Sequence, residues 1–513
     1  MWLVMSRLGE SMSSALRMSL LLSLVGLGTP GLAVAISGPD HKEQGKDGLD
    51  IWRKIGDAYD HDDCATVLKL AAPRLKASDS GGVPDKIRAM GYDFAASCAA
   101  RTDKGDLAYR YALDGTAMED SSDWLWRFRL AVELEKSQFE PALTTIEAMT
   151  QGRGAALNGV RIQWMYQLSS KLKAVHRDDL RRRLLKVLTA SYRPDNPFDS
   201  IDSFRQGYAG ILYDAGDKAG AEALIHDIDD ARIANELSFD PRFRPMLAAD
   251  FDVRAGVVRS LARARDLMRQ HPDQLEAIVQ VAEQLRRLGK PQEALAVLDT
   301  ARPAIAQTGA FTDKDEKLNW WWNGVASTQA MLGHYDEAIA AMRSGAEVKE
   351  QGELNVSQMI NLAEAQIHFG KPQEALATLA VFDGPPRALS PYGAMEMRFA
   401  RGCANALAGR KDALAADLAF VTEHETDHGE ALSDLLLCTG DMEGAAAAFI
   451  RRLDDPDRRV GALMQLSDYD TPPVALPDPV YANMPALKAR ADIRAAIARA
   501  GGTRRIHLQR DEL

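Results

Sequence analysis

The chain has 513 residues, of which 46% are hydrophobic and 26% are charged, and its formal net charge is −11. This is the composition of a folded protein with room for several domains or one elongated array. The negative charge argues against sequence-independent binding to nucleic acid, because phosphate contacts require clustered lysine and arginine. The most basic stretch, RDDLRRRLLK at 177–186, is interpreted as a solvated helix face.

Residues 1–35 have the pattern of a secretory signal peptide. Arg17 precedes the apolar run MSLLLSLVGLG at 18–28, and the sequence A-V-A at 33–35 provides a site for cleavage after Ala35. The apolar run is too short to span a bilayer, and no later segment has 18 uninterrupted apolar residues. We therefore expect an exported, soluble, periplasmic protein without stable membrane insertion. After cleavage the chain would begin with a mobile linker at 36–49.

Two features at the chain ends allow other interpretations. Translation from Met12 would still give a normal charged start to the signal peptide. The ending RDEL at 510–513 resembles an ER-retention signal, so residence in the ER lumen is kept as an alternative.

Residues 50–258 are predicted to form a degenerate half of a helical-repeat array. Short segments with turn residues followed by helical apolar spacing recur there: AYDHDDCATVL (58–68), DKGDLAYRYAL (103–113), KSQFEPALTTI (136–146) and DAGDKAGAEALI (214–225). They are looser copies of a pattern that is clearest further along the chain.

Residues 259–469 carry that pattern in its clearest form. LGKPQEALAVL (288–298) and FGKPQEALATL (369–379) are nearly identical, and LGHYDEAIAAM (332–342) lies between them with the same plan. LAGRKDALAADL (407–418) and CTGDMEGAAAAF (438–449) are weaker copies. The turn glycines are Gly289, Gly333, Gly370, Gly409 and Gly440.

Each copy is predicted to be a helical hairpin. Apolar residues follow helical spacing over 278–288, which gives one apolar stripe. Gly289 then suits a left-handed residue at the end of the first helix, and Pro291 suits the first turn of the next helix. A single hairpin cannot bury its apolar face, whereas stacked hairpins can, so an all-α solenoid is expected.

These residues resemble the tetratricopeptide repeat (TPR) family over about 273–380. The match is the G-x-[FY]-x-E-A-[IL] turn at Gly333–Ile339, with Trp322 upstream at the position of a large core aromatic and Pro272 before the hairpin that starts near Leu275. The resemblance implies a right-handed superhelix whose groove binds peptides or protein surfaces. The irregular spacing leaves other helical-hairpin repeats open.

A second internal similarity suggests two related halves. LAADFDVRAGV (247–257) and LKARADIRAAI (487–497) share seven positions of one pattern, so each half is predicted to end with the same element. Residues 470–513 are then a Pro-rich loop, a terminal capping helix near 485–500 and a tail. Coincidence between two Ala- and Arg-rich helices is the alternative.

The resemblance also indicates a candidate partner groove. By analogy with the ligand-contacting positions of the family, Trp320 and Asn323 would face the groove beside the core aromatic Trp322, and three residues of the next first helix would follow: Ile360, Glu364 and His368. A rigid aromatic beside polar groups is typical of a binding hot spot. The alternative is that Trp320 packs on an irregular neighbouring loop.

The segment EHETDHGE at 423–430 contains the metallopeptidase pattern H-E-x-x-H. In such enzymes one unbroken helix places two histidines on zinc and the glutamate beside them as general base, here His424, His428 and Glu425. However, Asp427 has the form of a helix N-cap with Glu430 three residues later, and the repeat frame places a hairpin junction there. The motif is therefore interpreted as fortuitous.

The four cysteines form two pairs, Cys64 with Cys98 and Cys403 with Cys438, separated by 34 and 35 residues. In the repeat frame each pair lies on neighbouring helices, and export would permit disulfides, so both pairs are candidate disulfides. Four buried free thiols are the alternative.

Neither the nucleophile motif G-x-S-x-G nor the phosphate-binding motif G-x-x-x-x-G-K-[ST] occurs in the sequence. We therefore expect no enzyme activity and no cofactor. The sequence predicts a non-catalytic periplasmic scaffold that binds another exported or envelope protein through a helical-repeat groove. The alternatives are a zinc metallopeptidase and an accessory subunit of an envelope assembly.

Overall fold

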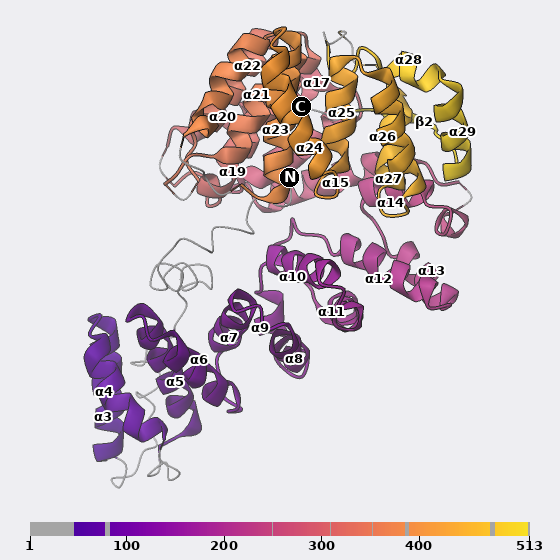
Figure 1. Ribbon diagram of the computed structural model, residues 1–513. Helices are drawn as coiled ribbons and strands as arrows, with labels where there is room; N and C mark the ends of the chain where they lie inside the picture. Colours follow the sequence, from indigo (N-terminus) through magenta and orange to yellow (C-terminus); the bar gives the residue numbers. More distant parts are fainter. Residues whose placement is uncertain are drawn as a thin grey trace. The chain divides into compact units, whose positions relative to one another are not determined.

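The structure, a computed structural model, describes residues 46–76, 83–248, 250–307, 309–350, 352–384, 389–471, 474 and 478–510. The predicted signal peptide, residues 36–45 of the predicted linker, half of the Pro-rich loop and the last three residues of the RDEL ending lie outside the described residues. The chain divides into an N-terminal unit that ends at Ile211 and a C-terminal unit that begins at Leu212 (Figure 1). Each unit is described by itself.

The N-terminal unit consists of antiparallel helices in consecutive hairpins. Its elements are α3 (Lys46–Asp60), α4 (Cys64–Leu75), α5 (Asp85–Arg101), α6 (Gly105–Thr116), α7 (Asp123–Glu135), α8 (Phe139–Met149), α9 (Gly154–Asn158), α10 (Ile162–Ala174), α11 (Asp178–Ser191) and the start of α12 (Asp202–Asp214). Helix contacts pair α3 with α4, α5 with α6, α7 with α8 and α10 with α11. Two hydrophobic cores follow each other along this unit, one reaching from Trp52 to Val132 and one from Trp126 to Phe204.

The hairpin turns of the N-terminal unit have a left-handed residue that is not glycine. Asp62, Asp103, Ser137 and His176 have φ of 64°, 57°, 53° and 55°. The first three lie in the loose repeat copies predicted from sequence, and His176 lies in the turn between α10 and α11, where the sequence predicts no repeat copy. These residues take the place of glycine although an L-residue is disfavoured in this conformation. The pattern of turn glycines therefore fades in this part of the sequence, while the hairpin geometry persists.

The C-terminal unit begins with α13 (Lys218–His226), α14 (Ala231–Phe239), the 3₁₀ turn η2 (Arg244–Met246) and α15 (Val253–Gln270). The hairpins follow: α16 (Leu275–Arg287) with α17 (Pro291–Asp299), α19 (Lys314–Met331) with α20 (Tyr335–Glu347), α21 (Val356–His368) with α22 (Pro372–Leu379), α23 (Pro391–Leu407) with α24 (Lys411–Glu423), and α25 (Gly429–Thr439) with α26 (Met442–Asp454). Short pieces α18 (Arg302–Ile305) and η3 (Ala380–Asp383) follow α17 and α22.

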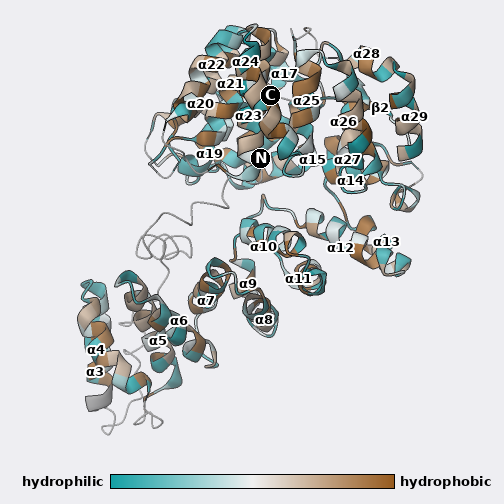
Figure 2. Ribbon diagram, in the orientation of Figure 1, coloured by the Kyte–Doolittle hydropathy of each residue, from teal (hydrophilic) through white to brown (hydrophobic). Residues whose placement is uncertain are grey.

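The glycine turns of these five hairpins are as the sequence predicts. The five glycines have φ between 71° and 81°: Gly289, Gly333, Gly370, Gly409 and Gly440. The first helices of neighbouring hairpins contact each other, α16 with α19, α21 with α23 and α23 with α25. One continuous apolar core runs through the unit, and its helices show the mixture of apolar and polar residues expected of amphipathic helices (Figure 2).

The C-terminal end of the chain completes this unit. It contains α27 (Arg459–Leu466), strand β1 (Asp468–Asp470), α28 (Met484–Ala489), α29 (Ala491–Ala500) and strand β2 (Arg505–Gln509). The parallel pair β1–β2 is the only sheet in the described part of the chain and an addition to the predicted all-α fold. The predicted terminal helix is two helices separated at Arg490. Both α15 and α29 begin within one residue of the aspartate that the two similar segments share; the relatedness of the two halves stays a prediction.

Both cysteine pairs are disulfide-bonded in the structure. Cys64 on α4 is joined to Cys98 on α5, with Cα atoms 5.0 Å apart. Cys403 on α23 is joined to Cys438 on α25, with Cα atoms 5.7 Å apart. Each bond therefore connects neighbouring hairpins within one unit. Among the described residues, no helix combines the length and apolar character needed to cross a membrane.

Candidate functional site

The predicted groove residues lie on two first helices, α19 and α21. Trp320 and Asn323 are half-buried on α19, and Glu364 and His368 are half-buried on α21. Ile360 is only 4% exposed and belongs to the apolar core. The sequence thus placed these five residues on the first helices of successive hairpins; their role in binding a partner stays a proposal.

The assignment of the core aromatic to Trp322 is wrong by one residue. Trp321 is fully buried (0% exposed), and its Nε1 donates a hydrogen bond to the carbonyl oxygen of Leu298 on the preceding hairpin at 3.0 Å. Trp322 is partly buried, with its ring at 4.7 Å from that of Trp321. Arg302 lies over both rings. A displacement of one position turns a helical side chain by about 100°, which decides which of the two rings enters the core.

Several buried polar atoms on α19 and α21 have no hydrogen-bond partner within the described part of the chain. They are Asn319 Oδ1, Asn323 Oδ1, both amide atoms of Gln358, and Glu364 Oε1. A buried polar atom without a partner costs about 1–3 kcal/mol, and such groups are few in native proteins. Two of these residues, Asn323 and Glu364, are predicted groove residues. Four of the five atoms are oxygens, which accept hydrogen bonds.

A second group of polar residues lies on the first helices of the last hairpins. We name Glu364, Tyr392, Glu396 and His428 the acid–histidine cluster. His428 precedes α25, and its Nε2 lies 2.7 Å from Glu396 Oε1 on α23. The ring of His428 lies 4.6 Å from that of Tyr392, also on α23. The cluster therefore joins three successive hairpins through their first helices.

The two carboxyl groups of this cluster have pKa values that are shifted in opposite directions. Burial and the neighbouring Glu396 carboxylate raise the pKa of Glu364 well above its usual range. Hydrogen bonds from His428, Tyr392 and Glu364 lower the pKa of Glu396 despite its burial. The pKa of His428 is raised by its hydrogen bond to Glu396, against the opposing effect of burial. These shifts favour a protonated Glu364 beside an ionised Glu396 that accepts a hydrogen bond from His428.

Asp434 on α25 lies at the centre of a neighbouring network. Its side chain accepts hydrogen bonds from Gln465 Nε2 at 2.7 Å and from the Tyr481 hydroxyl at 2.9 Å. Arg452 donates to Gln465 Oε1 and to Ser433 Oγ, both at 2.7 Å. Burial and the nearby Glu430 raise the pKa of Asp434 to about 7, against the opposing effects of Arg452 and of the hydrogen bonds from Tyr481 and Gln465.

The H-E-x-x-H segment spans a helix break, as the repeat frame predicts. Helix α24 ends at Glu423 with His424 as C-cap, and α25 begins at Gly429 with His428 as N-cap. The expected N-cap Asp427 is wrong by one residue, since His428 has the extended backbone of that position (φ −161°) and its side chain makes no capping hydrogen bond.

The three residues of the motif have separate partners. His424 Nδ1 lies 2.9 Å from the carbonyl oxygen of Phe420, and its ring stacks on that phenyl ring. Glu425 accepts two hydrogen bonds from the Arg451 guanidinium, while His428 is bonded to the acid–histidine cluster. Within the described ranges no group of three or more histidine, cysteine or acidic residues could hold a metal ion. The arrangement does not fit a zinc site.

The basic stretch at 177–186 is neutralised in part by acidic neighbours. Arg183 pairs with Glu140 and Glu147, and Arg177 pairs with Asp179 and Glu140. These ion pairs are consistent with a solvated helix face.

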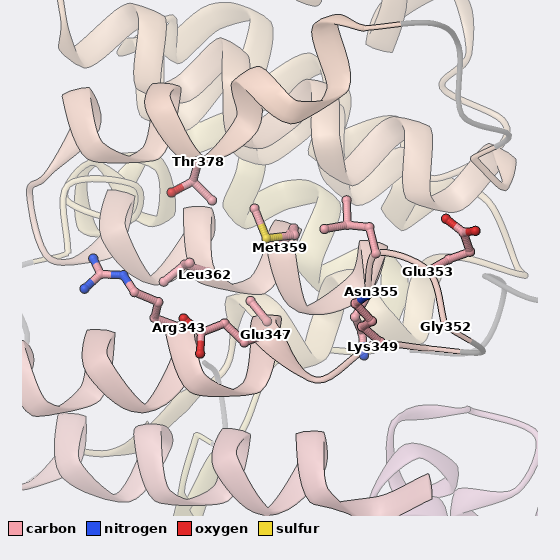
Figure 3. Close-up of a pocket in the computed structure, with 11 residues that line it drawn as sticks. Arg343, Glu347, Lys349, Gly352, Glu353, Asn355, Met359, Leu362 and Thr378 are labelled. Atoms are coloured by element: carbon pink, nitrogen blue, oxygen red, sulfur yellow. The ribbon is translucent and has the colours of Figure 1, made fainter. Parts of the chain in front are cut away.

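A surface cavity of about 530 Å³ lies at the junction between α20 and α21. Arg343 and Glu347 of α20 line it together with Met359 and Leu362 of α21 and Thr378 of α22 (Figure 3). None of the predicted groove residues lines this cavity. Its mixed polar and apolar lining does not indicate one class of ligand.

Sequence reasoning missed Tyr392, Glu396 and Asp434. Glu396 stands between two buried methionines, Met395 and Met397, and Asp434 is only 5% exposed among leucines. An acidic residue inside an apolar stretch of a first helix was the available signal, because such a residue needs buried partners. His428 had been noticed only as part of the zinc motif.

No protein-family model matches the chain, and no curated protein matches it. Among solved structures, it is similar to a Rap protein complexed with competence and sporulation factor (14% identity, covering 78% of this chain and 99% of that one, TM-score 0.33). It is also similar to the APC/C hetero-tetramer Cut9-Hcn1 (12%, 92% and 98%, TM-score 0.29) and to the P58(IPK) TPR domain (13%, 77% and 99%, TM-score 0.20). At these TM-scores the likenesses carry no argument about function. The chain's own hairpins, with their left-handed turns and stacked first helices, give it the fold of a TPR-like helical solenoid.

Proposed function

We propose that this protein is a non-catalytic, exported interaction scaffold that captures another exported or envelope protein on the first helices of its C-terminal unit. The observation that carries the proposal is the set of buried polar atoms without hydrogen-bond partners on α19 and α21. A partner whose binding rearranges these side chains would bring donors to the oxygen atoms and remove a cost of about 1–3 kcal/mol for each.

The chemistry of these atoms suggests the kind of contact that a partner makes. Asn323 Oδ1 and Glu364 Oε1 lack partners in the described chain, so a partner that donates amide, hydroxyl or ammonium hydrogens would fit them. Trp320, half-buried on the same helix as Asn323, would supply a rigid apolar contact beside these groups. The charged acid–histidine cluster lies further along the same series of first helices.

An exported location is part of this proposal. It is supported by the signal-peptide pattern at 1–35 and by the two disulfides, since disulfides form and persist in oxidising compartments. The periplasm is the compartment that we propose.

The zinc-peptidase alternative has no supporting observation, because the motif spans two helices and its residues have other partners. A role as an accessory subunit differs from the proposed scaffold only in the number of partners, and no feature of the described chain separates the two.

The test is capture of partners from envelope extracts by immobilised full-length protein. Three variants are compared with the wild type: Trp320→Ala and Asn323→Leu in the proposed surface, and Ala377→Asp on an exposed position of α22 as the matched control. The proposal predicts a partner that is retained by the wild type and by Ala377→Asp and lost by the other two. A partner retained equally by all four proteins would contradict it.

A further inference from the structure

The acid–histidine cluster joins hairpins that are held together in different ways. Glu396 on α23 lies 2.7 Å from His428 at the start of α25, and their side chains are 17% and 19% exposed. The Cys403–Cys438 disulfide joins the same two helices covalently. The chain has four cysteines, all used in its two disulfides, so no disulfide joins α21 to α23. We name the contact between these two helices the α21–α23 junction.

At the α21–α23 junction two carboxyl groups share one proton. Glu364 on α21 and Glu396 on α23 are hydrogen-bonded to each other, and a carboxyl group can donate a hydrogen bond only while it is protonated. Glu396 also accepts hydrogen bonds from His428 and Tyr392, which favours its ionised form. The proton therefore belongs to Glu364, whose pKa is raised by burial and by Glu396.

Loss of this proton would place two carboxylates in contact at a buried position. Glu364 Oε1 is buried and has no hydrogen-bond partner in the described part of the chain, so no donor there would offset a charge on that oxygen. Asp434 on α25 is the next acidic group that acts on Glu364, and Glu430 and Asp434 act on His428. His368, one turn further along α21, is bonded to the loop before α28. These surroundings make an ionised Glu364 unfavourable while the junction is closed.

We propose that the α21–α23 junction is a pH-sensitive joint, which is closed while Glu364 is protonated and opens when Glu364 loses its proton. The α21–α22 hairpin would separate from α23, whereas α25 would stay attached to α23 through the disulfide. No member of the cluster lines the cavity at α20 and α21, and opening requires no bound molecule. The inference therefore goes beyond the proposed scaffold function and does not depend on it.

The direction of the pH effect follows from the raised pKa of Glu364. A group whose pKa is higher in the folded than in the unfolded chain stabilises the fold at low pH, and this contribution is lost as pH rises through the folded pKa. The pKa of Glu396 is lowered, so its contribution is lost at the acidic end, as pH falls. The junction should therefore be closed near pH ~5 and open more often near pH ~9.

The experiment measures hydrogen exchange by mass spectrometry on the full chain at these two pH values. Protection factors are compared, because they correct for the base-catalysed rise in the intrinsic exchange rate. Two variants are measured beside the wild type. Glu364→Gln keeps a donor for Glu396 and cannot ionise, and Glu374→Gln removes an exposed carboxylate of α22 as the matched control.

In the wild type and in Glu374→Gln, opening of α21 and α22 should be at least about tenfold more populated at the higher pH, because one unit of pKa shift changes an equilibrium by about tenfold. In Glu364→Gln this change should fall below about twofold. Helices α25 and α26 should keep their wild-type pH dependence in this variant, because Asp434 still titrates there.

Three outcomes would overturn the proposal: no pH effect on α21 and α22 in the wild type, an equal effect in Glu364→Gln, or an equal reduction of the effect in α25 and α26. If Glu364→Gln does not fold, the wild type decides the question. A greater loss of protection in α21 and α22 than in α25 and α26 at the higher pH would support the joint, and an equal or smaller loss would contradict it.

Discussion

Replacing Trp321 by alanine tests the assignment of the core aromatic most sharply. Trp321 is fully buried, its Nε1 donates to the Leu298 carbonyl at 3.0 Å, and the Arg302 guanidinium lies 5.2 Å from its ring centre. Truncation of a buried tryptophan costs about 3–5 kcal/mol. An unpaired Leu298 carbonyl adds about 1 kcal/mol or more where water does not reach it. We therefore expect a loss of about 4–6 kcal/mol in the free energy of opening of α19 and α20.

The matched controls are its two neighbours in the same helix. Trp320→Ala should cost about 1 kcal/mol or less and Trp322→Ala an intermediate amount, because both side chains are only partly buried. Hydrogen exchange measured by mass spectrometry on peptides from α19 and α20 reports this local free energy in a chain with two units. A larger loss from Trp322→Ala than from Trp321→Ala would refute the assignment.

Four further predictions follow from the structure. Replacing Cys403 and Cys438 by serine should lower stability by about 3–4 kcal/mol, seen as a fall in Tm, and mass spectrometry of the alkylated, unreduced wild type should find neither thiol free. Asp434→Asn should flatten the pH dependence of the free energy of unfolding. In the folded wild type the pKa of Asp434 is about 7, above its value in the unfolded chain. This group therefore lowers wild-type stability by on the order of 4 kcal/mol as pH rises from about 4 to about 7. Ser137→Gly should raise the midpoint of urea unfolding, with a gain of about 0.5–1 kcal/mol from relief of the left-handed conformation. His424→Ala should leave metal content unchanged by elemental analysis; stoichiometric zinc lost in this variant would contradict the helix break.

The sequence predicts the C-terminal hairpins well because their turns depend on one residue type. Gly289 and Gly333 are left-handed in the structure, and glycine is favoured there because it has no Cβ. In the N-terminal unit the same position is taken by residues such as Ser137 and His176. A residue that is tolerated in the turn but not specific to it leaves no recognisable signal, so the α10–α11 hairpin was not found from sequence.

The site was less predictable because it depends on pairings between distant residues. His428 could be read from sequence only within a zinc motif, whereas in the structure it bonds to Glu396, 32 positions earlier. The register of the helices decides which residues meet, and a displacement of one residue, as with Trp321 and Trp322, changes the face of a side chain. The helix break at 424–428 was predictable because the repeat frame places a hairpin junction there, although the N-cap is His428 and not the expected Asp427.

The most direct test of the proposed scaffold is site-specific photo-cross-linking in envelope extracts. A benzoylphenylalanine residue is placed at position 320 on α19 in one protein and at the exposed position 377 on α22 in another. The proposal predicts a covalent adduct with one exported or envelope protein from position 320 and none from position 377. Adducts of equal yield from both positions, or from 377 alone, would contradict capture on the first helices.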